Sequence, residues 1–254
     1  MDMGRIAEEL SAGFRLASDE VALSSALDNA AKAMGFDHYA LSCGYRRGGG
    51  SAGALLLHDY PAEWANVYVT LDLAGNDPVR RACERSVTGF AWNGLGQLIP
   101  MTNGDHRMLG LGRECGIGDG YTVPRHLPGA IRGSCTFAIR PDSVLPQDML
   151  LVAEIVGGLA LARALQLSKP SPRGQRPTLS ERQRECLLWW GRGKTTGEIA
   201  TILGIGSETA IQHLKAARER YGVHCCQSLV IETLYEGVIG YGDVFATPGL
   251  QELR

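Results

Sequence analysis

The side chains best suited to hold a small polar molecule are three aromatics in the segment DYPAEWANVY, residues 59–68. Tyr60, Trp64 and Tyr68 lie four residues apart, a spacing that places them on one face of a helix. Indole N–H and phenol O–H groups are donors carried on apolar rings, so they can line a pocket that is apolar with a few polar points. Asp77 follows shortly after and adds a carboxylate, which accepts hydrogen bonds strongly.

Each of these residues also has a purely structural interpretation. Aromatic residues at positions i and i+4 most often belong to a helix core. Asp77 directly precedes Pro78, and this pair is typical of an N-cap followed by proline in the first turn of a helix. Residue type alone does not decide between a binding site and a packed helix.

A second group of candidate residues lies on a predicted helix over 207–221, whose inner face carries Ala210, Leu214 and Ala217. A shorter helix is predicted at 197–205, and Gly204 closes it. A short helix, a tight turn and a longer helix form the helix-turn-helix arrangement, which can place the second helix in a DNA major groove. The pattern alone leaves a plain helical bundle equally open.

The elements around these residues predict the fold class. In the N-terminal part, helices are expected at 18–34, 61–73, 78–87 and 147–167, and two pairs of strands at 38–47 and 54–60 and at 121–127 and 133–140. Gly48-Gly49-Gly50 separates the first pair as a loop tip. In the C-terminal part, a helix capped by Ser180 and one over 225–240 complete a set of four. We expect an α+β protein: an α/β/α sandwich with an antiparallel sheet, then an all-α four-helix domain.

A linker is predicted in LSKPSPRGQRPTLS, residues 167–180, which is rich in proline, serine and basic residues. We assign 1–167 to the first domain, 168–177 to the linker and 178–254 to the second domain. Residues 1–164 carry 14 basic and 18 acidic side chains, and residues 176–254 carry 9 of each. Bulk charge therefore gives no indication of DNA binding, and any such function must rest on pattern.

Composition predicts a cytoplasmic protein without a membrane partner. No run of 18 apolar residues occurs, and the N-terminus MDMGRIAEEL does not have the pattern of a secretory signal. The seven cysteines are scattered, with no CxxC spacing, which fits a reducing compartment. Cys225-Cys226 has no neighbouring histidine or acid pattern, so we expect no metal and no cofactor.

The sequence LSERQRECLLWWGRGKTTGEIATILGIGSETAIQHLKAARERYGV resembles the DNA-binding domain of the LuxR-type quorum-sensing transcription regulators. The ungapped match includes Glu185, Gly193-Lys194, Glu198-Ile199-Ala200, Leu203-Gly204-Ile205, Thr209, His213-Leu214 and Gly222-Val223. It implies that residues 207–221 are the recognition helix and that double-stranded DNA is a partner. The implied DNA contacts are Lys194, Thr209, Ile211, Gln212 and Lys215.

Two positions depart from the family pattern. Gly206 stands where a serine or threonine usually opens the recognition helix, and Ser207 could cap it instead. Ile211 stands where a basic residue is frequent; it can contact a thymine methyl group but cannot neutralise a phosphate. These changes affect the DNA sequence that is recognised more than the class of activity.

The resemblance extends to the N-terminal domain, which in this family binds N-acyl-homoserine lactones. The matching positions are Tyr60, Trp64, Tyr68, Asp77, Trp92 and Gly120. The resemblance implies that Trp64 donates to the lactone carbonyl, Tyr60 donates to the acyl carbonyl and Asp77 accepts from the ligand amide. Tyr68 and Trp92 would line the ligand, and Ser134, Leu56 and Tyr121 would face the acyl chain. Once buried, the amide and both carbonyls of such a ligand need partners.

Three other functions stay open. An enzyme could use His126 and Cys135, although these residues form no nucleophile motif. A regulator of the same family could respond to an aryl lactone or to a signal that is not a lactone. A DNA-binding protein without a ligand could use its N-terminal domain only to dimerise.

A homodimer is expected, because one helix-turn-helix reads few base pairs and the C-terminal domain has no net charge to hold it on DNA. Two copies would bind a palindromic site with half-sites about one helical turn apart. The expected dimer contact in the DNA-binding domain is the apolar face of 226–239, with Leu229, Leu234 and Val238. The N-terminal domain would supply a second contact.

Overall fold

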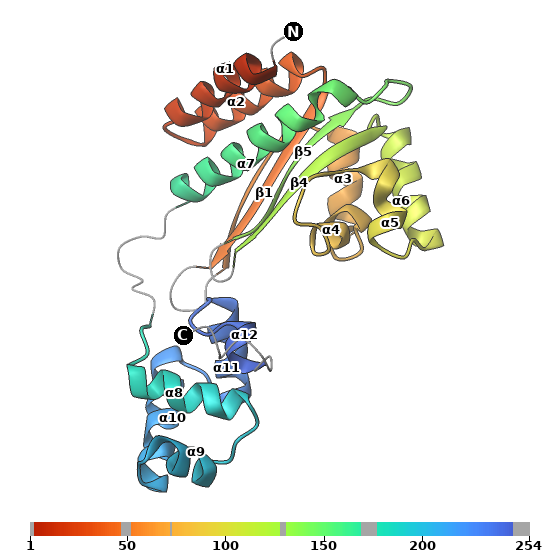
Figure 1. Cartoon of the computed structure of the whole chain (residues 1–254). Helices are drawn as coiled ribbons and strands as arrows, with labels where there is room; N and C mark the ends of the chain where they lie inside the picture. Colours follow the sequence, from red (N-terminus) through yellow and green to blue (C-terminus); the bar gives the residue numbers. More distant parts are fainter. Residues whose placement is uncertain (1–2, 47–51, 72, 128–130, 169–176, 246–254) are drawn as a thin grey trace. The chain divides into compact units, whose positions relative to one another are not determined.

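The computed structural model describes residues 3–46, 52–71, 73–127, 131–168 and 177–245 (Figure 1). The chain divides into two compact units, one formed mainly by residues 1–169 and one mainly by 170–254. The predicted linker, apart from its two end residues, and the glycine run 48–50 lie outside the described residues. The domain boundaries therefore stay predictions.

The first unit is built on a five-stranded sheet with the order β2-β1-β5-β4-β3. Its strands are β1 (His38–Arg46), β2 (Ala52–His58), β3 (Phe90–Ala91), β4 (Asp119–Leu127) and β5 (Ile131–Ile139). β4 and β5 form an antiparallel hairpin, and β1 pairs antiparallel with β5. All four predicted strands are present, and the two-residue strand β3 was not predicted.

Helices cover both faces of this sheet (Figure 1). One face carries α1 (Met3–Leu16), α2 (Glu20–Ala33) and α7 (Leu150–Leu167). The other carries α3 (Ala62–Thr70), α4 (Pro78–Cys83), α5 (Leu95–Leu98) and α6 (Asn103–Glu114), with the short 3₁₀ turns η1 (Leu73–Gly75) and η2 (Trp92–Gly94) between them. A third turn, η3 (Gln147–Met149), leads into α7. The predicted α/β/α sandwich is confirmed, although α1, α5 and α6 were not foreseen and α4 ends earlier than predicted.

The two faces of the sheet carry different side chains, because successive residues of a strand point to opposite sides. On the side of α2 and α7, the strands bury large or apolar groups, among them Leu41, Val123 and Phe137. The side of α3 to α6 carries smaller groups: Ala40, Ser42, Thr122, Ser134, Thr136 and Ala138. The second face therefore leaves room for the bulky side chains that the covering helices bring to it.

Helix α7 is the central helix of the first face. With η3 it is, within the described residues, the one segment long and apolar enough to cross a membrane by length and composition. Its inner side, including Val152, Val156 and Leu161, is buried in the domain. Its outer side exposes Leu151, Ile155 and Leu159 at four-residue intervals, so α7 is a core helix with an apolar stripe on its outer side.

The second unit is helical, with α8 (Glu181–Gly191), α9 (Thr196–Leu203), α10 (Ser207–Tyr221), α11 (Cys226–Tyr235) and α12 (Tyr241–Val244). Ser180 caps α8 as predicted, in a capping box with Gln183. The predicted helix over 225–240 ends at Tyr235, because Gly237 adopts a φ of 69° that a helix cannot continue through. One apolar core holds these helices together; its buried members are Cys186, Leu187, Ile199, Ala200, Ala210, Leu214, Ala217, Leu229, Ile239 and Val244.

Candidate ligand-binding and DNA-binding sites

The predicted aromatic residues come together over the sheet face that faces α3 and α6. Trp64 is only 8% exposed and belongs to a buried cluster with Met108 of α6 and Ala138 of β5. Other partly buried members of this cluster are Tyr60, Tyr68 and Trp92. The rings of Trp64 and Tyr68 meet edge to face, with centroids 5.7 Å apart. We call this group of four aromatic residues the aromatic cluster.

Asp77 connects the aromatic cluster to helix α4. Its Oδ1 accepts hydrogen bonds from the backbone N–H groups of Val79 (2.8 Å) and Arg80 (3.4 Å), so Asp77 is the N-cap of α4. Its Oδ2 accepts a hydrogen bond from the Tyr68 hydroxyl at 2.8 Å. Burial raises the pKa of Asp77, against the lowering effect of these hydrogen bonds. The N-cap interpretation is confirmed. The two carboxylate oxygens of Asp77 offer about four acceptor sites, so Asp77 can still accept a hydrogen bond from another donor.

Gly120 provides the space for Trp92. A Cβ atom at Gly120 would lie 2.9 Å from Cε2 of the Trp92 ring and 3.0 Å from the carbonyl oxygen of Phe137. Trp92 Nε1 donates to Thr122 Oγ1 at 2.9 Å, and Thr122 Oγ1 lies 2.9 Å from Thr136 Oγ1. The indole of Trp92 therefore lies against the backbone of β4, and its donor is already engaged.

The four aromatic residues differ in what their polar groups do. The hydroxyl of Tyr68 donates to Asp77, and the indole N–H of Trp92 donates to Thr122. Within the described part of the chain, the Tyr60 hydroxyl and the Trp64 N–H donate to no protein group. Burial raises the pKa of Tyr60, so its phenol stays protonated and keeps a hydrogen to donate. Two donors in the cluster are thus free for a ligand.

The residues expected near an acyl chain separate into three locations. Ser134 lies on the face of the aromatic cluster and is hydrogen-bonded to Cys83 of α4. Leu56 is 61% exposed on the edge strand β2. Tyr121 points to the opposite face, where its hydroxyl donates to Glu154 of α7 at 3.1 Å. The expectation that Tyr121 faces the acyl chain is wrong, because it follows Gly120 in a strand and must point the other way.

In the second unit, α9 and α10 form the predicted helix-turn-helix. Gly204 ends α9, and α10 buries Ala210, Leu214 and Ala217 against the domain core. The predicted DNA contacts on α10, Thr209, Ile211, Gln212 and Lys215, are all exposed. Ser207 does not cap this helix: Gly206 is the N-cap, with extended backbone and no side-chain hydrogen bond, and Ser207 is the first helical residue.

The two lysines among the predicted DNA contacts are paired with acids of their own segment. Lys194 Nζ lies 3.2 Å from Glu198 Oε1, in the turn before α9. Lys215 Nζ lies 3.9 Å from Glu219 Oε1, one turn along α10. Such exposed pairs contribute little stability, so a phosphate group can replace the acid at little cost.

Two family matches cover these two sites. Residues 19–167 match the family described as "Autoinducer binding domain", and residues 177–233 match "Bacterial regulatory proteins, luxR family". The chain belongs to the LuxR family. It is a LuxR-type transcription regulator with an autoinducer-binding domain and a helix-turn-helix domain, and the family's role in quorum sensing applies to it. LuxR-family proteins are regulators rather than enzymes, which excludes a catalytic role for His126 and Cys135.

Named relatives agree with this placement. The chain is 27% identical over 194 residues to the transcriptional activator AhyR of Aeromonas hydrophila, covering 74% of this chain and 75% of that protein. It is 28% identical over 218 residues to RpaR of Rhodopseudomonas palustris, a quorum sensing-dependent transcriptional regulator, covering 86% and 88%.

Solved structures show the same fold. SdiA of Escherichia coli has a TM-score of 0.69 at 20% identity, covering 94% of this chain and all of that one. A structure of SdiA in complex with octanoyl-rac-glycerol has a TM-score of 0.68 at 21% identity, covering 95% and 98%.

Sequence reasoning missed two residues of this LuxR-family site, Thr122 and Thr136. Both are buried, and they connect Trp92 to the middle of the sheet. Their alternation with apolar neighbours in the strand sequences was a usable signal for their face, but their pairing depends on the register of β4 and β5.

Within the described residues, no three side chains of His, Cys, Asp or Glu come together as a metal site.

Proposed function

We propose that this LuxR-family regulator binds an N-acyl-homoserine lactone at the aromatic cluster, and binds a palindromic DNA site as a homodimer in the cytoplasm. The observation that supports the ligand is the division of hydrogen-bond donors. Tyr68 and Trp92 use theirs within the protein, while Tyr60 and Trp64 do not. The ligand has two carbonyl acceptors, which is the number of free donors.

The remaining polar group of the ligand is its amide N–H, for which Asp77 has acceptor capacity. In this proposal the lactone carbonyl accepts from Trp64, the acyl carbonyl accepts from Tyr60, and the amide donates to Asp77. The acyl chain then runs over the small side chains of the sheet, including Ser134. Every polar group of the buried ligand would have a partner, as burial requires.

Two tyrosine variants test this assignment against each other. Tyr60→Phe removes a hydroxyl that has no partner in the described structure, so we expect it to weaken ligand binding by about 0.5–1.5 kcal/mol and to leave unliganded stability unchanged. Tyr68→Phe removes the donor to Asp77, so it should lower the stability of the unliganded protein. Titration calorimetry with N-octanoyl-homoserine lactone and thermal unfolding measure the two effects. Wild-type affinity in Tyr60→Phe would contradict the proposed role of that hydroxyl.

A second ligand class, an acyl compound without a lactone, shares part of this chemistry. The fold neighbour SdiA has been solved with octanoyl-rac-glycerol, whose ester carbonyl and hydroxyls could use Tyr60 and Trp64 but which has no amide hydrogen for Asp77. A panel of acyl lactones, aryl lactones and acyl glycerols distinguishes the classes. The compound that binds the native state raises Tm by an amount that follows RT ln(1 + [L]/Kd), and mass spectrometry of protein produced with the panel identifies it. No shift with any member would favour a regulator without a ligand.

The homodimer proposal is supported by the apolar stripe of α7. Leu151, Ile155 and Leu159 point outward from the first unit at helical spacing. Exposed apolar rows of this kind mark interaction surfaces, and a second copy presents the same row for a two-fold contact. In the DNA-binding domain the expected contact must be corrected: Leu229 is fully buried in the core. The exposed apolar residue of α11 is Ile231, at 66%.

The DNA proposal is supported by the outer face of α10. Gln212 can bond adenine bidentately, Ile211 can contact a thymine methyl group, and Lys215 can reach guanine or phosphate. Because residues 176–254 carry no net charge, a single copy has little electrostatic attraction to DNA, which favours binding as a pair. Footprinting on a palindrome of about 20 base pairs tests the arrangement; protection of a single half-site by a monomer would overturn it.

A further inference from the structure

His38 and Asp59 contact the tyrosine that is proposed to bind the acyl carbonyl. Tyr60 directly follows Asp59, and its ring meets the imidazole of His38 edge-on, with centroids 6.3 Å apart. The ring of His58 lies near Tyr60 as well, at 5.9 Å and tilted by 35°. His58 is exposed at the end of β2, whereas the side chain of His38 is only 17% exposed. Of the two imidazoles beside Tyr60, one is therefore enclosed and one is in solvent.

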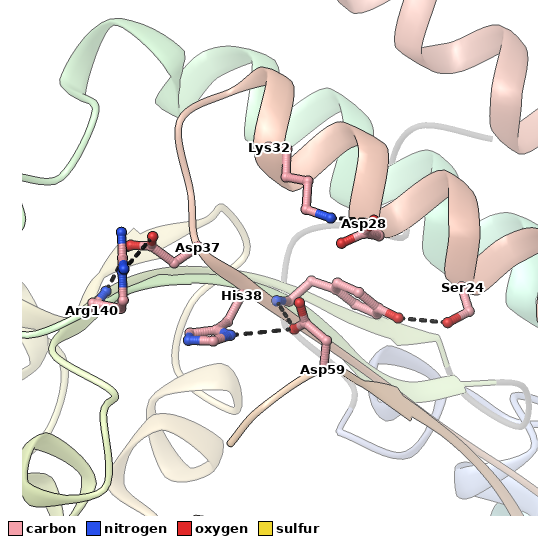
Figure 2. Close-up of polar contacts among 8 residues, drawn as sticks. Ser24, Asp28, Lys32, Asp37, His38, Asp59 and Arg140 are labelled. Carbon is pink, nitrogen blue, oxygen red and sulfur yellow. Dashed lines mark hydrogen bonds and ion pairs between the residues drawn. The ribbon is translucent and has the colours of Figure 1, made fainter. Parts of the chain in front are cut away.

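Asp59 fixes the chain on which Tyr60 is carried. Its Oδ1 accepts from the backbone N–H of Tyr39 at 2.7 Å, and its own N–H donates to the Tyr39 carbonyl at 3.2 Å. The Tyr39 hydroxyl in turn lies 2.6 Å from Ser24 Oγ of α2 (Figure 2). The backbone just before Tyr60 is thus held to β1, and Tyr60 can adjust chiefly through its side chain.

The contact between His38 and Asp59 is incomplete. Nδ1 of His38 is buried and has no hydrogen-bond partner, and it lies 3.8 Å from Asp59 Oδ1 (Figure 2). That distance is within reach of an ion pair but too long for a hydrogen bond. An imidazolium would be drawn to the carboxylate and could donate to it, while a neutral ring gains much less.

The other charged groups nearby are already paired. Asp37, which precedes His38, accepts two hydrogen bonds from Arg140. The backbone N–H of Arg140 donates at 2.9 Å and its Nε donates at 2.8 Å. On α2, Asp28 binds Lys32 at 2.7 Å (Figure 2). Asp59 is therefore the acid that faces His38, and a charge on His38 acts directly on Asp59 and Tyr60.

We propose that His38 is a positioning residue for Tyr60, and that its protonation tightens ligand binding by fixing the Tyr60 ring and strengthening its hydroxyl as a donor. This inference rests on the proposed ligand role of Tyr60. A positive charge beside the phenol favours the negative charge that builds up on the oxygen when the hydroxyl donates. Protonated His38 therefore favours the ligated state, and affinity rises as pH falls.

The test is the affinity for N-octanoyl-homoserine lactone, measured between pH 7.5 and 5.5. Strong base would open the lactone ring, and this range avoids it. We expect Kd of the wild-type protein to fall about three- to tenfold across this range. His38→Phe keeps a ring of similar size without the charge, and should remove the pH dependence. Asp59→Asn keeps an acceptor for the Tyr39 N–H and should also remove the pH dependence. His58→Phe is the matched control, which should keep it.

Two results overturn the inference: a wild-type Kd that does not change with pH, or a pH dependence that survives unchanged in either His38→Phe or Asp59→Asn. Thermal unfolding at each pH confirms that the variants are folded, and the two variants act on different elements, so misfolding of one leaves the other informative. Tyr60→Phe separates this inference from the proposed function. If Tyr60→Phe binds the lactone as well as wild type, the ligand role of Tyr60 fails. If it binds more weakly and His38→Phe keeps the pH dependence, only the inference about His38 fails.

Discussion

Replacing Asp77 with asparagine separates the ligand-binding role of this side chain from its capping role, because the two residues have nearly the same shape. Asparagine is as good an N-cap as aspartate, so its amide oxygen can keep the hydrogen bond from Val79 N–H. The substitution removes the negative charge and the second acceptor oxygen, which accepts from Tyr68. The amide N–H of a bound lactone would then face an uncharged side chain with one acceptor, already in use.

The expected magnitudes follow from these contacts. In the unliganded protein, a charged hydrogen bond from Tyr68 becomes a neutral one, in which the asparagine amide donates to the phenol oxygen; this costs about 1 kcal/mol. Burial raises the pKa of Asp77, so the fold opposes its ionisation, and the neutral amide avoids that cost. The free energy of unfolding should therefore change by less than about 1 kcal/mol. Lactone binding should weaken by about 1.5–3 kcal/mol, the range for a hydrogen bond to a charged group.

Titration calorimetry with N-octanoyl-homoserine lactone and thermal unfolding of the unliganded protein measure the two quantities separately. A loss of 1.5–3 kcal/mol corresponds to a Kd about 10- to 150-fold higher. The matched variant is Asp77→Ala, which also removes the cap and should cost a further 0.5–2 kcal/mol of stability, roughly. Wild-type affinity in Asp77→Asn would refute the ligand role. A loss of unliganded stability as large as the loss of affinity would show that capping is the main role of Asp77.

Three further predictions concern the packing, the dimer and the DNA contact. Gly120→Ala would place a methyl group 2.9 Å from the Trp92 ring, so we expect stability to fall by about 1–3 kcal/mol in thermal unfolding, with weaker lactone binding; an unchanged Tm would contradict this close contact. Ile155→Glu, on the outer face of α7, should convert the dimer to monomer in analytical ultracentrifugation without unfolding it, and a persistent dimer would exclude the α7 stripe as the interface. Gln212→Ala should relax specificity at one base pair per half-site, at about 1–3 kcal/mol per lost base contact. Lys215→Ala should weaken all DNA sequences similarly and reduce the salt dependence by about one unit per subunit; binding indifferent to both changes would mean that α10 does not enter the groove.

The parts of the fold that sequence predicted well are those with a local signal. Ser180 and Gly204 mark helix ends through their own chemistry, and both do so in the structure. Helix α6 also had such a signal, since Thr102 and Asp105 form its capping box. It was missed because Gly104, Gly110 and Gly112 lower its helical propensity, which packing against the aromatic cluster overrides.

The candidate site was predictable in its residue types and not in its connections. Tyr60, Trp64 and Tyr68 share one location, as their spacing predicted, although Tyr60 precedes α3 and only Trp64 and Tyr68 lie on the helix. The bond between Tyr68 and Asp77 could not be read from sequence, because it depends on how α3 and α4 meet. The same holds for the engagement of Trp92 by Thr122, which depends on the position of η2 over β4. Local pattern identifies the residues, and tertiary contacts decide which of their donors remain free.

The free donors have a consequence for stability. Tyr60 and Trp64 belong to the apolar cluster that packs the sheet against α3 and α6, so the ligand would complete part of the domain core. A hydrogen bond contributes about 0.5–1.5 kcal/mol of net stability, and a ligand that offers two carbonyls could form one with each of these two donors. The rings of Tyr60 and Trp64 pack in the unliganded fold, and their donor groups would add stability only in the liganded one. Ligand binding would in that case act on the stability of the whole first domain, which is how a small molecule could control the amount of folded regulator available to bind DNA.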